Sequence, residues 1–200
     1  MKSWQEKGCD SPLCYYKKVG VSNDDTSDTA KSSFTSKDFL LVIQMPSQCE
    51  ILRSNERTLC ADATHGVTGY GYYLLTILVV DIFGQGYPIG WCITSRENGL
   101  IWNIFALSLK KKTGHVSPQV LMADDDNSAW NGLRAVWPSL KYKLLCHWHV
   151  KKNVRQHCVG SKCKVQVTLH TPYEHAMNNL AHTVMKIKKK GTMNIPMNML

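Results

Sequence analysis

Two aspartates, Asp62 and Asp124, each stand at the end of an apolar run that is typical of a strand. Asp62 closes "RTLCAD" and precedes the turn "ATHG", and Asp124 closes "PQVLMAD". An unpaired carboxylate is costly to bury, so each aspartate either caps a turn through nearby backbone N–H groups or belongs to a site. Two carboxylates side by side repel each other unless a cation lies between them. Mg²⁺ is such a cation, because it binds one or two carboxylates together with substrate phosphate.

A second group of side chains that could bind a metal lies further along the chain. Cys146 and His149 have Cys-x2-His spacing, and Cys158 and Cys163 follow them. Thiolate and imidazole are the usual ligands of Zn²⁺, so these residues could close a tetrahedral site. The spacing differs from that of a standard zinc finger, and the same residues could simply cap the strand before them. Both interpretations stay open at this point.

Basic residues dominate the second half of the chain. The formal net charge is +9, and Glu174 is the only acidic residue after Asp126. Such a surplus favours a polyanionic partner, and we expect DNA. Lys151, Lys152 and Arg155 fall on one side of a predicted helix, where they would contact backbone phosphates in a salt-dependent manner. A solvated, solubilising face is the alternative interpretation.

The elements that would position these residues follow from hydrophobic patterning. Three strand-like runs separated by short glycine-bearing turns predict an antiparallel meander. The later runs extend the order to β-β-β-α-β-α-β-α, which predicts an α/β domain with a mixed five-stranded sheet flanked by helices. A right-handed crossover would bring the fourth strand parallel to the first, with Asp62 beside Asp124. The predicted strands are 57–62, 72–81, 87–94, 118–124 and the start of 142–157, and the predicted helices are 99–114, 127–138 and the rest of 142–157.

The chain upstream of the meander divides into two parts. Residues 36–56 predict a helix that begins after Ser36 and is broken or kinked by Pro46. Residues 20–37 are rich in Ser, Asp and Thr and predict a linker. The expected domains are a polar N-terminal tail (1–37), a core (38–157), and a basic, partly helical C-terminal segment (158–200).

The sequence also bears on location. The first residues lack the apolar segment of a secretory signal peptide, and the longest apolar run, Tyr72–Val80, is too short to cross a bilayer. We therefore expect an intracellular protein with no membrane partner and with its eight cysteines mostly reduced. The run Lys186–Lys190 is either a second phosphate contact or a nuclear import signal, and the nucleus is the predicted location. A homo-oligomer is left open.

Residues 38–157 resemble the transposase core of Mutator-like elements. The resemblance is carried by the order and spacing of "DATHG" (62–66), Gly-x-Gly-x-Pro (84–88), "SRE" (95–97), "ADDD" (123–126) and "LLCHWHV" (144–150). It implies a ribonuclease-H-like fold with a DDE metal site that binds Mg²⁺ or Mn²⁺ and cleaves and transfers DNA strands. Asp62 and Asp124 would be the first two acids, with Asp125 and Asp126 leaving a choice for the second. Cys146 and His149 would match the family's Cys-x-x-His.

The third acid of the family is a glutamate on a helix further downstream, and we identify no counterpart for it. Glu174 lies in an amphipathic stretch, where it is expected to complement a helix dipole. The predicted function is therefore a transposase-derived DNA-binding domain of the DDE type, truncated relative to the family, whose ancestral metal-dependent strand cleavage is weak or lost. A non-catalytic module that binds nucleic acid, chromatin or protein is the alternative.

Overall fold

The three runs that predict a meander pair as antiparallel neighbours in the computed structural model of the chain. β3 (Thr58–Thr64) pairs with β4 (Tyr73–Val80), and β4 pairs with β5 (Gly86–Thr94). Buried and half-buried side chains alternate along β4, which is the period of a strand with one face on a core. The predicted meander is confirmed. The structure describes residues 11–20, 34–66, 69–81 and 83–159.

The crossover after the meander also forms as predicted. The helix α3 (Gly99–Thr113) leads to β6 (Val120–Ala123), which pairs with β3 in parallel. The register sets Cys60 opposite Met122. The chain then continues through α4 (Asn127–Val136) to β7 (Tyr142–Leu145). The sheet is therefore mixed, with parallel and antiparallel pairs.

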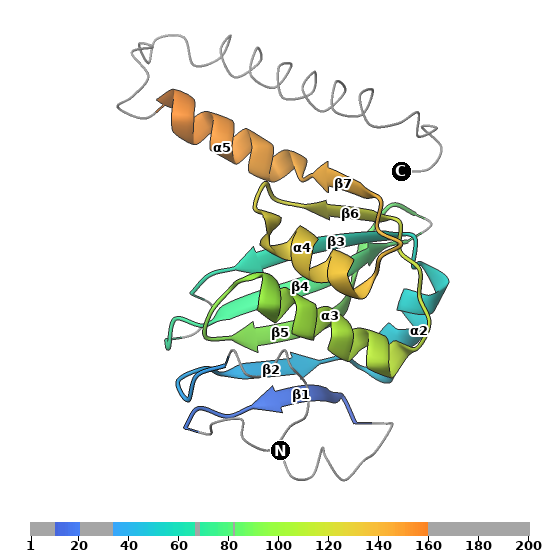
Figure 1. Ribbon diagram of the computed structural model, residues 1–200. Helices are drawn as coiled ribbons and strands as arrows, with labels where there is room; N and C mark the ends of the chain where they lie inside the picture. Colours follow the sequence, from blue (N-terminus) through green and yellow to red (C-terminus); the bar gives the residue numbers. More distant parts are fainter. Residues whose placement is uncertain (1–10, 21–33, 67–68, 82, 160–200) are drawn as a thin grey trace. The chain divides into compact units, whose positions relative to one another are not determined.

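The sheet has seven strands and not the predicted five, in the order β1-β2-β5-β4-β3-β6-β7 (Figure 1). The two additional strands precede the meander in sequence. They are β1 (Leu13–Lys17) and β2 (Leu40–Ile43), and β2 pairs antiparallel with both β1 and β5. These pairings join segments far apart in the chain, so no local pattern signals them.

The predicted helix over residues 36–56 is wrong in its first half, which contains β2. Leu40 and Val42 are fully buried and alternate with half-buried neighbours, but a short apolar run cannot be assigned to strand or helix by periodicity alone. The helix α2 (Pro46–Ser54) begins at the proline that was expected to break it. Proline suits the first helical position, because the N–H that it lacks has no partner there.

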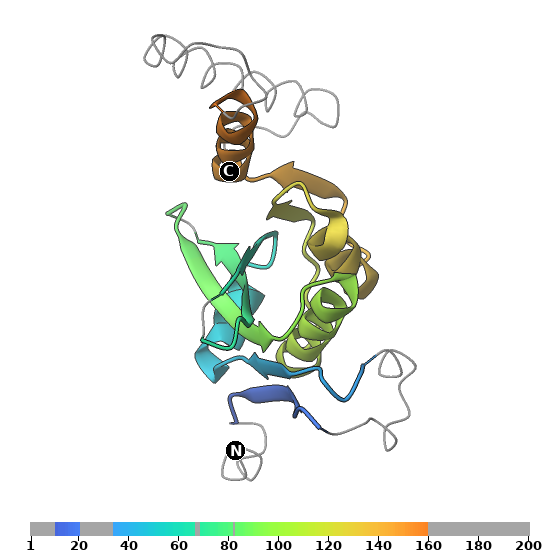
Figure 2. The same cartoon turned by 90° about the vertical axis from the view of Figure 1, so that its left-hand side faces the viewer.

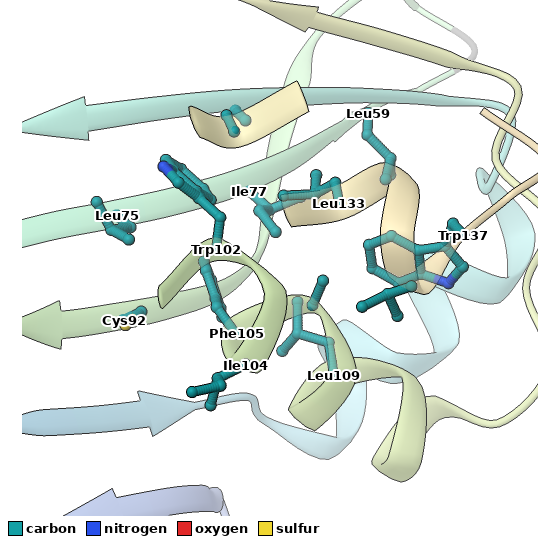
Figure 3. Close-up of a cluster of buried hydrophobic side chains, with 14 of the residues drawn as sticks. Leu59, Leu75, Ile77, Cys92, Trp102, Ile104, Phe105, Leu109, Leu133 and Trp137 are labelled. Atoms are coloured by element: carbon teal, nitrogen blue, oxygen red, sulfur yellow. The ribbon is translucent and has the colours of Figure 1, made fainter. Parts of the chain in front are cut away.

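The helices α3 and α4 lie over one face of the sheet (Figures 1 and 2). Figure 3 shows their side chains meeting those of β3, β4 and β5. Trp102, Phe105 and Leu109, together with Leu133 and Trp137, are at most 1% exposed. Fully burying one such side chain contributes roughly 1.5–3 kcal/mol, so this core fixes the strands firmly.

Residues Leu144–Leu200 form a second compact unit, distinct from Met1–Lys143. Its described element is the helix α5 (His147–Val159), which carries the basic residues singled out above. Across the described ranges, no helix has both the length and the apolar character needed to span a bilayer.

Candidate metal and nucleic-acid site

Asp62 lies on the face of β3 that points away from the core. Leu59 and Ala61 are buried, and Asp62 is exposed, as expected where successive side chains point to opposite faces. The strand continues to Thr64, two residues beyond the predicted end. Across the β3–β4 pair, Asp62 lies opposite Thr76. The aspartate is thus held on an interior strand with a neighbour on each side.

The register of the parallel pair relates Asp62 to Asp124. Thr58, Leu59 and Cys60 lie opposite Val120, Leu121 and Met122 in turn. The paired residues end at Cys60 and Met122, and the same register extended by two positions would set Asp62 opposite Asp124, which immediately follows β6. Neighbouring strands in a sheet lie about 4.8 Å apart, a separation at which two carboxylates can share a cation.

The three consecutive aspartates after β6 differ in their surroundings. Asp124 is half-buried, whereas Asp125 and Asp126 are exposed. Asp126 is the N-cap residue of α4 but makes no side-chain capping hydrogen bond. Lys143 Nζ donates to the Asp126 carbonyl at 2.9 Å and to Asn127 Oδ1 at 3.1 Å, which holds the turn in place. Asp124 is the member of the three that lies in register with Asp62.

Glu97 is a residue to which the sequence patterns assigned no chemical role. It lies between β5 and α3, and its Oε1 accepts a hydrogen bond from Trp102 Nε1 at 3.2 Å. Its Oε2 lies 3.8 Å from His65 Nε2, and the side chain is 18% exposed against 68% for His65. His65 in turn meets the ring of Tyr73 edge-on, with 4.6 Å between ring centroids. Glu97 therefore joins the end of β3 to the start of α3.

The electrostatic environment of Glu97 links it to the aspartates. Burial raises the pKa of its carboxyl group, and the carboxylates of Asp124 and Asp126 raise that pKa further. The Trp102 hydrogen bond and His65 act in the opposite direction on the pKa. These couplings place Glu97 within electrostatic range of the acids that follow β6. The sole sequence signal was its position in "SRE", immediately before a predicted helix.

The donor set at the ends of β3 and β6 suits one kind of metal. Asp62 and Asp124 offer two carboxylates, which fits Mg²⁺ or Mn²⁺ with water and a phosphate completing the shell. The pair lacks the four nitrogen or sulfur ligands of a structural zinc site. Within the described ranges, no group of three or more His, Cys, Asp or Glu side chains is placed to hold a metal ion.

The proposed zinc ligands lie in the second unit. Cys146 and His149 are half-buried and flank the start of α5. Cys163 lies outside the described residues, and so does the side chain of Cys158. Zinc binding by this group stays a prediction.

The basic residues predicted to contact DNA occur on α5. Lys151 is half-buried and Lys152 is exposed, with the Lys152 ammonium 4.9 Å from the ring centroid of Trp148. Trp148 is itself 60% exposed. Arg155 belongs to the same helix, and its side chain lies outside the described part. An exposed ammonium beside an exposed indole is the combination that contacts nucleic-acid backbone and bases.

Comparison with known families connects these observations. Residues 58–153 match the family model of the MULE transposase domain. The match contains Asp62, Asp124, Cys146 and His149. No curated protein matches the chain.

Proposed function

We propose that this MULE transposase domain, residues 58–153, is a DNA-binding domain with a ribonuclease-H-like fold and a divalent-metal site built on Asp62 and Asp124. The observation that supports the proposal is the parallel register between β3 and β6, which would set the two aspartates opposite each other when it is extended by two positions. The meander followed by a parallel fourth strand is the topology that the resemblance implies. The family match spans both aspartates, which ties their alignment to one domain.

The chemistry would be an in-line displacement at a DNA phosphorus. Asp62 and Asp124 would hold Mg²⁺ or Mn²⁺, which stabilises charge on the phosphate and activates the attacking oxygen. His65 would contact the same phosphate group, a role supported by its exposure and its position three residues after Asp62. Lys151, Lys152 and Arg155 would hold the DNA backbone independently of its sequence.

A second candidate function is nucleic-acid binding without strand cleavage. It is favoured by the two-carboxylate donor set, since a pair of metal ions needs further acidic ligands. This shortage of acidic ligands would explain the weak or lost strand cleavage that the sequence predicts. Both functions would use Lys151, Lys152 and Arg155 to bind DNA. They differ in whether the bound DNA strand is cleaved. A nuclear location is consistent with either and rests on the Lys186–Lys190 run alone.

The test compares the purified chain with Asp62→Asn, Asp124→Asn and the neighbouring control Asp125→Asn. Mn²⁺ affinity is measured by electron paramagnetic resonance, and nicking of supercoiled DNA is measured in Mg²⁺ and in Mn²⁺. We expect each of the first two variants to weaken Mn²⁺ binding at least tenfold and the control to change it less than twofold. Equal Mn²⁺ affinity in all four proteins would reject the metal site.

The same proteins separate the two functions. Nicking by the wild type that Asp62→Asn abolishes supports catalysis, whereas equal signals from both proteins reject it. DNA affinity that falls as salt rises supports binding. If the chain fails to bind DNA even at low salt, the nucleic-acid functions are both rejected and a protein-interaction role takes their place.

A further inference from the structure

Four aromatic rings form a continuous row outside the hydrophobic core. They belong to Tyr16, Phe39, Tyr72 and Tyr70, which we call the aromatic strip. The ring of Phe39 stacks on that of Tyr72 with centroids 5.0 Å apart and planes 10° apart. The ring of Tyr16 meets that of Phe39 edge-on, with centroids 6.1 Å apart, and the ring centroids of Tyr70 and Tyr72 are 5.9 Å apart. Each ring thus supports the next, from β1 to the connection between β3 and β4.

The aromatic strip lies on the same face of the sheet as Asp62. Asp62 is opposite Thr76 on β4, and Tyr72 lies four residues before Thr76 in the chain. Because strand side chains alternate between faces, Tyr72 and Thr76 point to the same side, away from the core beneath α3. Tyr16 agrees with this placement, because it pairs with the half-buried Leu41 rather than with a core residue of β2.

The aromatic strip also lies at the Asp62 end of the strands. Phe39 N–H donates to Ser95 Oγ at 3.1 Å, and Ser95 N–H donates to the Phe39 carbonyl at 3.1 Å. Ser95 directly follows β5, and Tyr72 directly precedes β4. The same edge of the sheet carries the end of β3, two residues after Asp62. The row therefore leads away from the candidate metal site toward the edge strand β1.

The exposure and charge of the aromatic strip indicate its partner. Tyr70 is 85% exposed, so its ring faces solvent while the rest of the row supports it. Lys18 and Lys37 are exposed and lie two residues from Tyr16 and from Phe39. The nearby carboxylate of Asp38 is 3.2 Å from Arg96 Nε and is largely buried, which neutralises it. The surroundings of Tyr16 and Phe39 thus combine aromatic rings with two exposed lysines.

We propose that the aromatic strip is a stacking platform for single-stranded DNA beside the candidate metal site, with Tyr70 as its outermost ring. The inference rests on the proposed function and names the form of DNA that the site takes. Aromatic rings beside cations bind single strands with little sequence preference, because every unpaired base has a face to stack on. Bases in a duplex are already stacked on each other, so Tyr70 offers much less to intact double-stranded DNA.

The test measures the affinity of the full chain for a labelled single-stranded oligonucleotide and for the matching duplex by fluorescence anisotropy. We expect Tyr70→Ala to weaken single-strand binding about tenfold, in line with the usual value of one stacked base, and to change duplex binding less than twofold. Tyr70→Phe keeps the ring and should bind like the wild type. Phe83→Ala is the matched control, because Phe83 is 81% exposed but lies between β4 and β5, at the opposite end of β4 from Tyr70.

Three results would overturn the inference. Tyr70→Ala could bind the single strand like the wild type, it could lose single-strand and duplex binding equally, or Phe83→Ala could lose as much as Tyr70→Ala. In each case the wild type still binds DNA, so the proposed function survives. If the wild type binds neither form of DNA, the proposed function fails and this inference fails with it.

Discussion

The carboxylate of Glu97 lies 3.8 Å from the imidazole Nε2 of His65, which joins the entry to α3 to the end of β3. The pKa of the Glu97 carboxyl group is raised, chiefly by burial and further by the negative charges of Asp124 and Asp126. Glu97 is held from the other side by the indole of Trp102, which is 1% exposed. A core residue thereby fixes the orientation of a polar group at the candidate site.

The raised pKa of Glu97 makes a testable contribution to the pH dependence of stability. A carboxyl whose pKa is higher in the folded state keeps its proton longer when folded. It therefore favours folding at low pH, and this contribution is lost as pH rises from about 4.5 through the folded pKa. Glu97→Gln removes this titration while its amide oxygen can still accept from Trp102. We expect the variant to gain stability relative to wild type across that window.

The measurement is the free energy of unfolding in urea at several pH values from 4 to 8. Glu50→Gln removes an exposed carboxylate on α2 and controls for the loss of one negative charge. A stability difference between Glu97→Gln and wild type that stays constant across this range would contradict the burial of the carboxylate.

The contact between α3 and α4 predicts that Gly132→Ala is destabilising. A Cβ atom at Gly132 would lie 2.5 Å from the Gly99 carbonyl oxygen and 2.5 Å from Trp102 Cβ. Replacing glycine by alanine inside a helix ordinarily stabilises it by about 0.5–1 kcal/mol, but overpacking costs about 1–3 kcal/mol. We expect a net loss of about 1–2 kcal/mol in thermal or urea unfolding.

Ala135→Gly is the control for this prediction, because Ala135 is exposed on the same helix and its change reports helix propensity alone. If Gly132→Ala stabilises the protein by as much as Ala135→Gly destabilises it, the two helices do not approach as closely as described.

The caps of α3 and α4 differ in a way that unfolding experiments can detect. Asn98 Oδ1 accepts a hydrogen bond from the Ile101 N–H at 3.1 Å, whereas Asp126 makes no such bond at the start of α4. Losing a cap of the first kind costs about 1 kcal/mol. We expect Asn98→Ala to lower the free energy of unfolding by that amount and Asp126→Ala to change it by less than half as much. Equal losses would argue against the difference in capping.

Burial should protect two thiols from alkylation. Burial raises the pKa of Cys14 to about 11 and raises that of Cys92 further still. The thiolate is the reactive species, so at pH 8 both side chains should react with iodoacetamide at least tenfold more slowly than in the urea-unfolded protein. Mass spectrometry of tryptic peptides gives the two rates. Native alkylation of Cys92 at the unfolded rate would contradict its complete burial.

The basic residues of α5 should set part of the salt dependence of DNA binding. Each phosphate contact contributes about −0.9 to the slope of log affinity against log salt for a duplex. Lys151→Ala with Lys152→Ala should therefore reduce the slope by about 1–2 and weaken binding to all sequences alike. Lys141→Ala, an exposed lysine in the first unit, is the matched control. An unchanged slope in the double variant would exclude α5 from the DNA interface.

An element of this fold can be predicted from the sequence when its pattern lies within a short stretch of the chain. The meander and the crossover can be predicted, because strand alternation, glycine turns and helical spacing are short-range features. The strands β1 and β2 were missed, since they exist through pairing with distant segments and β2 occupies an apolar run of ambiguous period.

The sequence likewise identifies some residues of the candidate site and not others. Asp62 and Asp124 were singled out from strand ends, and their alignment follows from a crossover that sequence can predict. Glu97 was not assigned a role, because its relation to His65, Trp102 and Asp124 arises only from tertiary packing. A lone glutamate before a helix is common and carries no information about what faces it.

The pairing of β3 with β6 has a further consequence for how this domain can diverge. Cys60 pairs with Met122, so insertions or deletions in the long connection through α3 would leave unchanged the two-residue steps from Cys60 to Asp62 and from Met122 to Asp124. One residue inserted between Cys60 and Asp62, or between Met122 and Asp124, would instead turn a carboxylate to the other side of the sheet. Divergent copies of the domain should therefore differ in the number of residues between their two acids. They should keep the two-residue spacings from Cys60 to Asp62 and from Met122 to Asp124.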